Sequence, residues 1–177
     1  TPQADRKAIQ YHYDVSNEFY RLFLDRNMVY SCAYFRGDAD TLDQAQEQKL
    51  DYILAKLRVQ PGHRLLDIGC GWGALIIRAA AKYGCFATGI TLSRNQYELA
   101  RERIRAEGLE GRCEIRLQDY RDVPETGGYD RIASVGMFEH VGLKHLGAYF
   151  RKLDALLADD GVVLNHGITA AHPDNRV

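Results

Sequence analysis

The chain has 177 residues, 46% of them hydrophobic, and a formal net charge of −1 at pH 7. This length predicts one domain with a substantial core, and the interleaved acids and bases argue against a nucleic-acid-binding surface. No apolar run approaches the about 18 residues of a membrane-spanning helix. The four cysteines lack C-x-x-C spacing, which favours reduced thiols in a cytosolic protein and no metal site.

Two helices are predicted before residue 62. Ser16 can cap a short helix that carries Phe19, Tyr20, Leu22, Phe23 and Leu24, and we expect this helix to pack on the body of the protein. Residues 28–35 are predicted to be extended. Thr41-Leu42-Asp43-Gln44 fits a capping box that opens a longer amphipathic helix, which ends before Pro61-Gly62.

From residue 63 onward, predicted strands alternate with helices. The pattern indicates an α/β fold with a doubly wound, mostly parallel sheet and helices on both faces. We place strands at 64–68, 85–90, 113–117, 129–135 and 162–169. Helices run from the first strand to Tyr83, from the capping box Ser93-x-x-Gln96 to Glu107, and through Leu146–Leu157.

A glycine-rich loop follows the first strand and opens the next helix. Gly69 and Gly71 let the backbone adopt positive φ and approach a ligand at a helix end whose free N–H groups carry partial positive charge. The loop also fits the dinucleotide pattern G-x-G-x-x-G/A. However, the acid that this pattern requires about 20 residues later is absent from Gly89-Ile90-Thr91, so NAD is not expected. An ordinary strand-to-helix turn is the plain alternative.

Six stretches together resemble cyclopropane-fatty-acyl-phospholipid synthases and mycolic acid cyclopropane synthases. They are Tyr13-Asp14-Val15-Ser16-Asn17-Glu18-Phe19-Tyr20, Tyr30-Ser31-Cys32-Ala33-Tyr34-Phe35, the glycine loop with Trp72, Gly89-Ile90-Thr91-Leu92-Ser93, Gln118-Asp119-Tyr120 and Phe138-Glu139-His140-Val141-Gly142. The resemblance implies a Rossmann-like class I methyltransferase fold of seven strands. Because five strands can be placed, we expect the sheet to be truncated before the last two. Residues 1–62 would form a helical cap, acting as a cofactor and substrate lid, and residues 63–177 a core incomplete at its C-terminus.

The resemblance also implies S-adenosylmethionine as co-substrate. Its methionine side would be lined by Tyr30, Ser31, Gly69, Gly71 and Trp72, its ribose would lie near Thr91, Leu92 and Gln96, and its adenine near Asp119 and Tyr120. Asp67, two residues before the first glycine, resembles the first motif of these methyltransferases and is also assigned to the cofactor. The Thr91 hydroxyl and the Gln96 amide can hydrogen-bond ribose hydroxyls in place of the missing acid. Tyr30 as a core residue and Gln96 as a capping residue remain open alternatives, and Trp72 either covers a ligand or exposes apolar area.

For the chemistry, the resemblance implies methyl transfer to a cis double bond, leaving a carbocation that aromatic faces such as that of Tyr13 stabilise. A bound bicarbonate would then remove a proton so that the ring closes. Groups resembling Cys32, Glu139 and His166 would hold it, with the Val135 carbonyl nearby. The alternatives are Cys32 as a small buried hydrophobe, Glu139 as a helix cap and His166 as a core histidine; His140 competes for either role.

The expected function is therefore methylene transfer from S-adenosylmethionine to unsaturated phospholipid acyl chains, giving a cyclopropane ring and S-adenosylhomocysteine. Fatty-acyl C-methylation without ring closure, small-molecule methylation and a catalytically silent cofactor-binding module are the alternatives. We expect a cytoplasmic protein, peripheral at the inner face of the membrane, whose lipid contacts come mainly from regions outside this chain. A homodimer is left open, and the chain by itself is expected to bind cofactor without efficient turnover.

Overall fold

The computed structural model describes residues 16–126 and 128–169. Five strands in this part form one sheet, and every neighbouring pair is parallel. The helices and strands are, in chain order, α2 (Asn17–Arg21), α3 (Leu42–Lys56), β1 (Arg64–Ile68), α4 (Ala74–Tyr83), β2 (Phe86–Thr91), α5 (Arg94–Ala106), β3 (Cys113–Leu117), β4 (Tyr129–Val135), α6 (Leu146–Leu156) and β5 (Leu157–His166).

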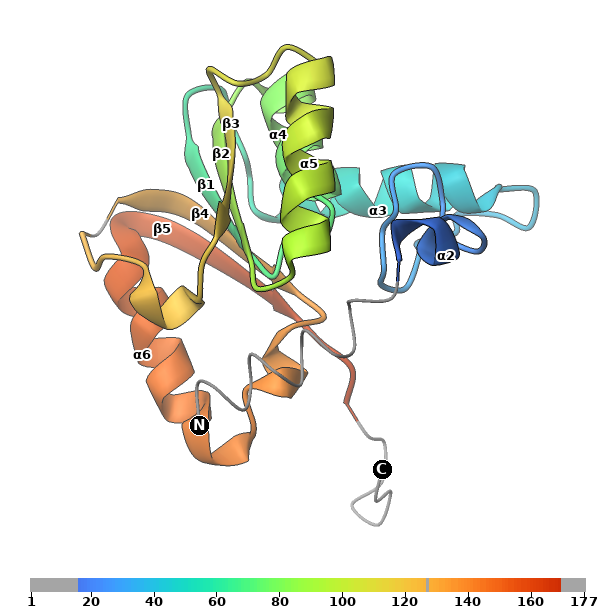
Figure 1. Ribbon diagram of the computed structural model, residues 1–177. Coiled ribbons are helices and arrows are strands. Elements are labelled where there is room, and N and C mark those ends of the chain that lie inside the picture. Colours follow the sequence, from blue (N-terminus) through green and yellow to red (C-terminus); the bar gives the residue numbers. More distant parts are fainter. Residues whose placement is uncertain (1–15, 127, 170–177) are drawn as a thin grey trace.

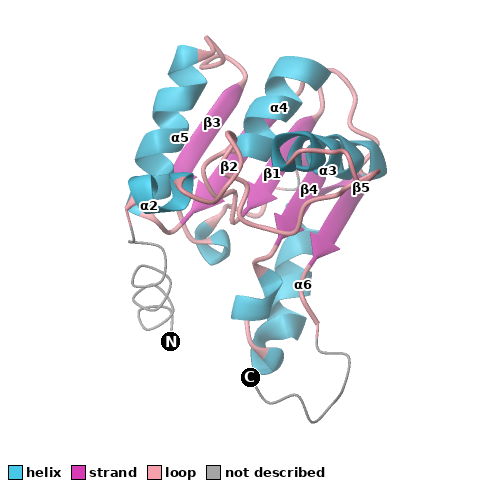
Figure 2. Cartoon of the chain, turned by 90° about the vertical axis from the view of Figure 1, so that its right-hand side faces the viewer, coloured by secondary structure: helices cyan, strands magenta, loops and turns pink. Residues whose placement is uncertain are grey.

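The order of the strands determines where a ligand can bind. It is β3-β2-β1-β4-β5, with β1 in the middle (Figure 2). The chain builds outward from β1 through β2 to β3, then returns to place β4 and β5 on the other side of β1. In such sheets ligands bind in the crevice outside the carboxyl ends of the strands, where the order reverses. Here that point lies between β1 and β4.

Helices cover both faces of the sheet, as predicted. Figure 1 shows α4 and α5 on one side and α6 on the other. One buried cluster joins α3, α4 and α5 to sheet residues such as Leu65 and Ala133. The second joins Tyr149, Leu153 and Leu156 of α6 to sheet residues on the opposite face. The α/β, doubly wound class predicted from the sequence is confirmed.

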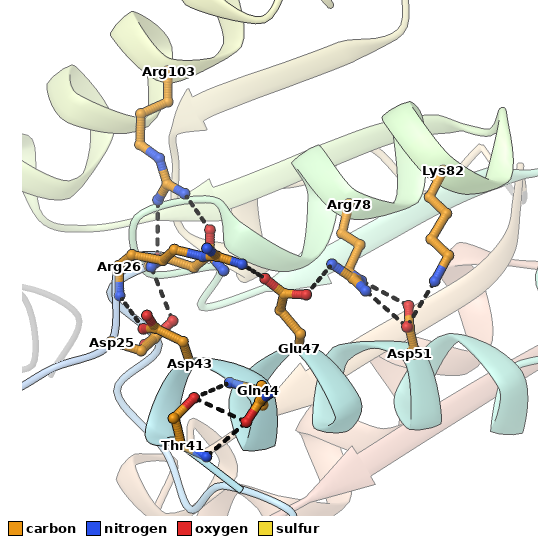
Figure 3. Close-up of polar contacts among 11 residues, drawn as sticks. Asp25, Arg26, Thr41, Asp43, Gln44, Glu47, Asp51, Arg78, Lys82 and Arg103 are labelled. Atoms are coloured by element: carbon orange, nitrogen blue, oxygen red, sulfur yellow. Dashed lines mark hydrogen bonds and ion pairs between the residues drawn. The ribbon is translucent and has the colours of Figure 1, made fainter.

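Helix α3 is anchored at its start and along its length. The Thr41 hydroxyl oxygen accepts the Gln44 N–H at 3.3 Å and the Gln44 side-chain oxygen accepts the Thr41 N–H at 2.9 Å, which completes the predicted capping box. Further along, Figure 3 shows Asp51 facing two cations of α4. Arg78 binds it with two hydrogen bonds of 2.6 and 2.7 Å, and Lys82 with one of 2.8 Å. These contacts fix α3 across α4.

Several predicted boundaries need correction. The second strand starts and ends one residue later than expected, and the last strand is 157–166 instead of 162–169. Tyr129 already pairs with Leu157, and an irregularity in the register then absorbs the polar residues before Val162. Apolar periodicity cannot detect this early pairing, because Asp159, Asp160 and Gly161 interrupt the apolar pattern between Leu157 and Val162.

The N-terminal helix is shorter than predicted. Ser16 does cap it, but it ends at Arg21, and of its aromatic side chains only Tyr20 is buried in the core. Phe19 and Phe23 remain about half exposed, and Leu22 more so. The expectation that this segment packs on the body therefore holds through Tyr20 and the partly buried Leu24, which join a cluster with Trp72.

Candidate cofactor site and active site

A cavity lies at the carboxyl edge of the sheet, where the strand order reverses. Its lining comes from the segment after α2, from α3, and from the residues that follow β1, β2, β3 and β4. Every residue predicted to contact the cofactor lines it: Tyr30, Ser31, Asp67, Gly69, Gly71, Trp72, Thr91, Leu92, Gln96, Asp119 and Tyr120. The fold thus gathers motifs that are far apart in the sequence around a single space.

The glycine loop leaves this space open. Gly69 and Gly71 have φ of 78° and 55°, in the left-handed region. A Cβ added at Gly71 would meet no atom within 4 Å, whereas one at Gly69 would lie 2.9 Å from Met137 Cγ. Helix α4 begins after Gly73 with no side-chain cap. Its first-turn N–H groups are therefore suited to polar ligand atoms.

Trp72 does not expose apolar area, so that alternative is wrong, while its covering of a ligand stays a prediction. Its side chain lines the cavity, yet the residue is only 1% exposed. The ring lies 4.8 Å from that of Tyr20, and the indole N–H donates to Asn17 Oδ1 at 2.7 Å. Trp72 therefore attaches the N-terminal segment to the glycine loop, and packing against Tyr20 removes its apolar area from water. Tyr30, half exposed beside the same ring cluster, is not a core residue.

Two of the three residues expected near the ribose, Thr91 and Gln96, bond each other. The Thr91 hydroxyl donates to the Gln96 side-chain oxygen at 2.7 Å and accepts the Ser93 N–H at 3.2 Å. The Ser93 hydroxyl accepts the Gln96 N–H at 3.3 Å, but the Gln96 side chain does not return to the Ser93 backbone. The predicted capping box is thus only half formed. Because the oxygen of Gln96 is used by Thr91, its amide N–H groups are the part available to a ligand.

At the expected adenine edge, Asp119 is tied to its own chain. Both carboxylate oxygens accept from the Arg121 guanidinium, at 2.9 and 2.7 Å, and one also accepts the Arg121 backbone N–H at 3.0 Å. Tyr120 packs edge to face on Tyr149, with ring centroids 5.4 Å apart. Asp119 is therefore held in a fixed orientation beside the Tyr120 ring.

Two buried charges lie near the glycine loop. Asp67 is 4% exposed, and burial raises its pKa to about 7, an effect that the nearby Lys49 opposes. Lys49, on α3, is 7% exposed and also lines the cavity. Burial lowers its pKa to about 8, partly offset by Asp25, Cys32 and Asp67. A charged pair desolvated in a cleft is typical of a functional site.

Lys49 was missed at the sequence level, although a signal existed. The apolar face of α3, with Leu50, Ile53 and Leu54, continues one turn earlier through Gln46 and Lys49 at helical spacing. Both polar side chains are buried on that face. A lysine interrupting an apolar stripe indicates that the stripe faces something polar.

The proposed catalytic residues are partly brought together. Glu139 Oε1 accepts the Ile168 N–H at 2.7 Å, two residues beyond His166, and the His166 carbonyl accepts the Gly136 N–H at 2.9 Å. A Cβ at Gly167 would lie 3.2 Å from Glu139 Cδ, so the end of β5 packs tightly on this turn. Glu139 is accordingly not a helix cap, and the exposed His166 is not a core histidine.

Cys32 lies in the segment between α2 and α3 and is exposed, so it is not a small buried hydrophobe. Among the described residues, none of Cys32, Glu139 and His166 lines the cavity, whereas Val135 and His140 do. Tyr13 lies outside the described residues. Residues 16–126 and 128–169 also contain no cluster of three metal-ligating side chains and no helix suited to crossing a membrane.

The parallel sheet with a cavity at its glycine loop defines a Rossmann-like fold. Comparison with known proteins narrows the class. The sequence model described as "Mycolic acid cyclopropane synthetase" matches residues 1–177, and the chain belongs to this family.

Two curated relatives and one crystal structure illustrate the family. A "Probable fatty acid methyltransferase" of Pseudomonas putida is 52% identical over 98% of this chain and 44% of its own length. The "Cyclopropane-fatty-acyl-phospholipid synthase" of Escherichia coli K12 is 46% identical over 94% of this chain and 42% of its length. A mycolic acid cyclopropane synthase crystallised with SAH and CTAB superposes with a TM-score of 0.86 at 42% identity, covering 90% of this chain and 55% of that one. The chain thus spans about half the length of these relatives.

Proposed function

We propose that the protein transfers a one-carbon group from S-adenosylmethionine to the cis double bond of an unsaturated phospholipid acyl chain, forming a cyclopropane ring. One observation carries the proposal. All the described residues that the family resemblance assigns to the cofactor surround one cavity at the topological switch point. Family membership supports the same reaction class.

The residues of the cavity fit S-adenosylmethionine. Open space at Gly71 and uncapped N–H groups at α4 admit the methionine end against the backbone. The amide N–H groups of Gln96 suit the ribose hydroxyls. When bound, S-adenosylmethionine supplies an electrophilic methyl group. The half-exposed ring of Tyr30 lines the cavity and can stabilise a carbocation through its quadrupole.

The proposal that a bound bicarbonate acts as the base is supported by one buried atom that lacks a hydrogen-bond partner. Glu139 Oε2 is buried and accepts no hydrogen bond from the described residues. It is an acceptor suited to the hydroxyl of bicarbonate, with His166 on the adjacent strand end. Glu139, His166 and Cys32 would hold the anion, and bicarbonate would supply the proton acceptor for ring closure. Contact with the membrane, from the cytoplasmic side, belongs to the same proposal because the acyl chain lies in a bilayer.

Fatty-acyl methylation without ring closure is the second candidate, because the 52% identical relative is named a fatty acid methyltransferase. Both reactions add the mass of one CH2 to the lipid, so mass alone cannot separate them. Incubation of the full-length protein with S-adenosylmethionine and vesicles of a cis-monounsaturated phospholipid tests both. Upfield cyclopropane protons with loss of the alkene signal support ring closure. A retained alkene supports methylation only, and unchanged lipid refutes the proposal.

A further inference from the structure

Lys49 is a buried cation for which the cofactor assignment provides no role. It projects from the middle of α3 and lines the same cavity as the glycine loop. Burying an ammonium group is costly unless it gains a compensating partner. The charges around the cavity indicate what that partner is.

Lys49 bonds only to Ser31 among the described residues. Its ammonium donates to the Ser31 hydroxyl oxygen at 2.6 Å and to the Ser31 carbonyl at 3.3 Å. A lysine has three donors, so one remains. Because the Ser31 oxygen accepts from Lys49, the Ser31 hydroxyl proton is free to donate elsewhere. Both side chains line the cavity, so they present two donors to a ligand.

Asp67 is an acidic group in the same space. It accepts no hydrogen bond from any described residue, although it is 4% exposed and lines the cavity. The other buried acid of the cavity, Asp119, is paired with Arg121 at 2.7 Å. Asp67 and Lys49 attract each other electrostatically, yet no ion pair joins them. The cavity thus presents a separate positive and a separate negative group beside the glycine loop.

We propose that Lys49 binds the carboxylate of the co-substrate's amino-acid group, with Ser31 and Asp67, which the family resemblance already assigns to the cofactor, beside that carboxylate and the ammonium group. This inference rests on the proposed function and deepens it, since it assigns recognition of the zwitterionic end of S-adenosylmethionine. Two oppositely charged groups with unused hydrogen-bonding capacity are complementary to a zwitterion. A nucleoside without the amino-acid group gains no binding free energy from either Lys49 or Asp67.

A structural clamp is the competing role for Lys49. Gln46, one turn earlier on α3, holds the same segment, because its amide donates to the Val29 carbonyl at 3.2 Å and to the Ser31 carbonyl at 2.9 Å. Gln46→Met therefore loosens the segment without removing a charge. It is a matched control for Lys49→Met.

The test compares two ligands that differ only in the amino-acid group. S-adenosylhomocysteine carries it, and 5′-methylthioadenosine lacks it. Dissociation constants are measured by calorimetry for the wild type, Lys49→Met, Lys49→Arg and Gln46→Met. Loss of a charge-assisted hydrogen bond predicts that Lys49→Met weakens S-adenosylhomocysteine roughly 10- to 100-fold and leaves methylthioadenosine within about twofold. Lys49→Arg should recover part of the loss, and Gln46→Met should weaken both ligands by similar factors.

The outcomes separate the two proposals. Equal weakening of both ligands by Lys49→Met, or none, overturns the role of Lys49 and leaves S-adenosylmethionine binding intact. A wild-type protein that binds neither ligand refutes the proposed function, and the inference with it. If Lys49→Met does not fold, the methyl ester of S-adenosylhomocysteine tests the carboxylate on the wild type. Its affinity should fall by the same 10- to 100-fold, and unchanged affinity overturns the inference.

Discussion

Replacing Asp67 by Asn should remove a pH dependence that the buried carboxyl imposes on the stability of the fold. Burial raises the pKa of Asp67 from 3.8 to about 7. Between these two values the folded protein binds more protons at this site than the unfolded chain does. The contribution of Asp67 to stability is therefore fully present below pH 3.8 and is lost as the pH rises through 7.

The size of this effect follows from the shift. A difference of about three pKa units corresponds to about 4 kcal/mol of unfolding free energy. Lys49 acts at higher pH with the opposite trend. Its pKa falls from 10.5 to about 8, so its contribution to stability increases as the pH rises from 8 toward 10.5. Together the two groups give their least favourable contribution between pH 7 and 8.

Urea denaturation followed by the fluorescence of Trp72, the single tryptophan, measures the effect. The wild type should lose up to about 4 kcal/mol relative to Asp67→Asn between about pH 4 and pH 8, because other titrating groups cancel in the difference. Asp154→Asn, at an exposed position, is the control and should follow the wild type. Parallel stability profiles for Asp67→Asn and the wild type would refute the reasoning.

Three further predictions concern the loop and α3. Gly71→Ala and Gly62→Ala both place a Cβ at positive φ in open space, so each should cost about 1–2 kcal/mol of stability. Only Gly71→Ala should also weaken the binding of S-adenosylhomocysteine in a calorimetric titration. Equal affinities of the two variants would show that nothing binds against Gly71. Asp51→Asn should cost about 1–2 kcal/mol at neutral pH. Its partner Arg78 holds the pKa of Asp51 below its usual value, so this cost, measured by urea denaturation, should shrink as the pH falls below 3.8, and a constant cost would contradict it. Thr41→Ala should cost about 1 kcal/mol by the same measurement, through loss of the α3 cap, and a cost near zero would show that the hydroxyl bond contributes little.

Sequence patterns predicted many helix boundaries correctly, because contacts within a few residues determine these boundaries. The α3 capping box, the start of α4 after the glycine loop and its end at Gly84 follow from side chains or backbone conformations within a few residues. The start of β5 did not follow, because Leu157 enters the sheet by pairing with Tyr129, a contact between residues far apart in the sequence. Long-range pairing overrides local polarity.

The candidate site, like the fold, was predicted only in part from the sequence. Motif order located the residues that line the cavity, since the carboxyl ends of parallel strands converge at one edge. Lys49 was missed because its importance depends on Asp67 and Ser31, which lie on separate elements and meet it only in the folded chain. The burial of Trp72 did not follow from the sequence for a related reason. Its neighbour Tyr20 comes from a short helix whose docking position no local pattern predicts.

The contacts that join the N-terminal segment to the sheet lie at the glycine loop itself. Arg103 of α5 donates to the Asn27 carbonyl and to the Trp72 carbonyl, each at 3.0 Å, and thereby links the two parts. A ligand in the cavity would lie among residues of both parts, because Ser31 and Gly71 both line it. Because such a ligand binds only when both are in place, its binding free energy would stabilise the docked segment. The cavity and the docking of the N-terminal segment are therefore energetically coupled.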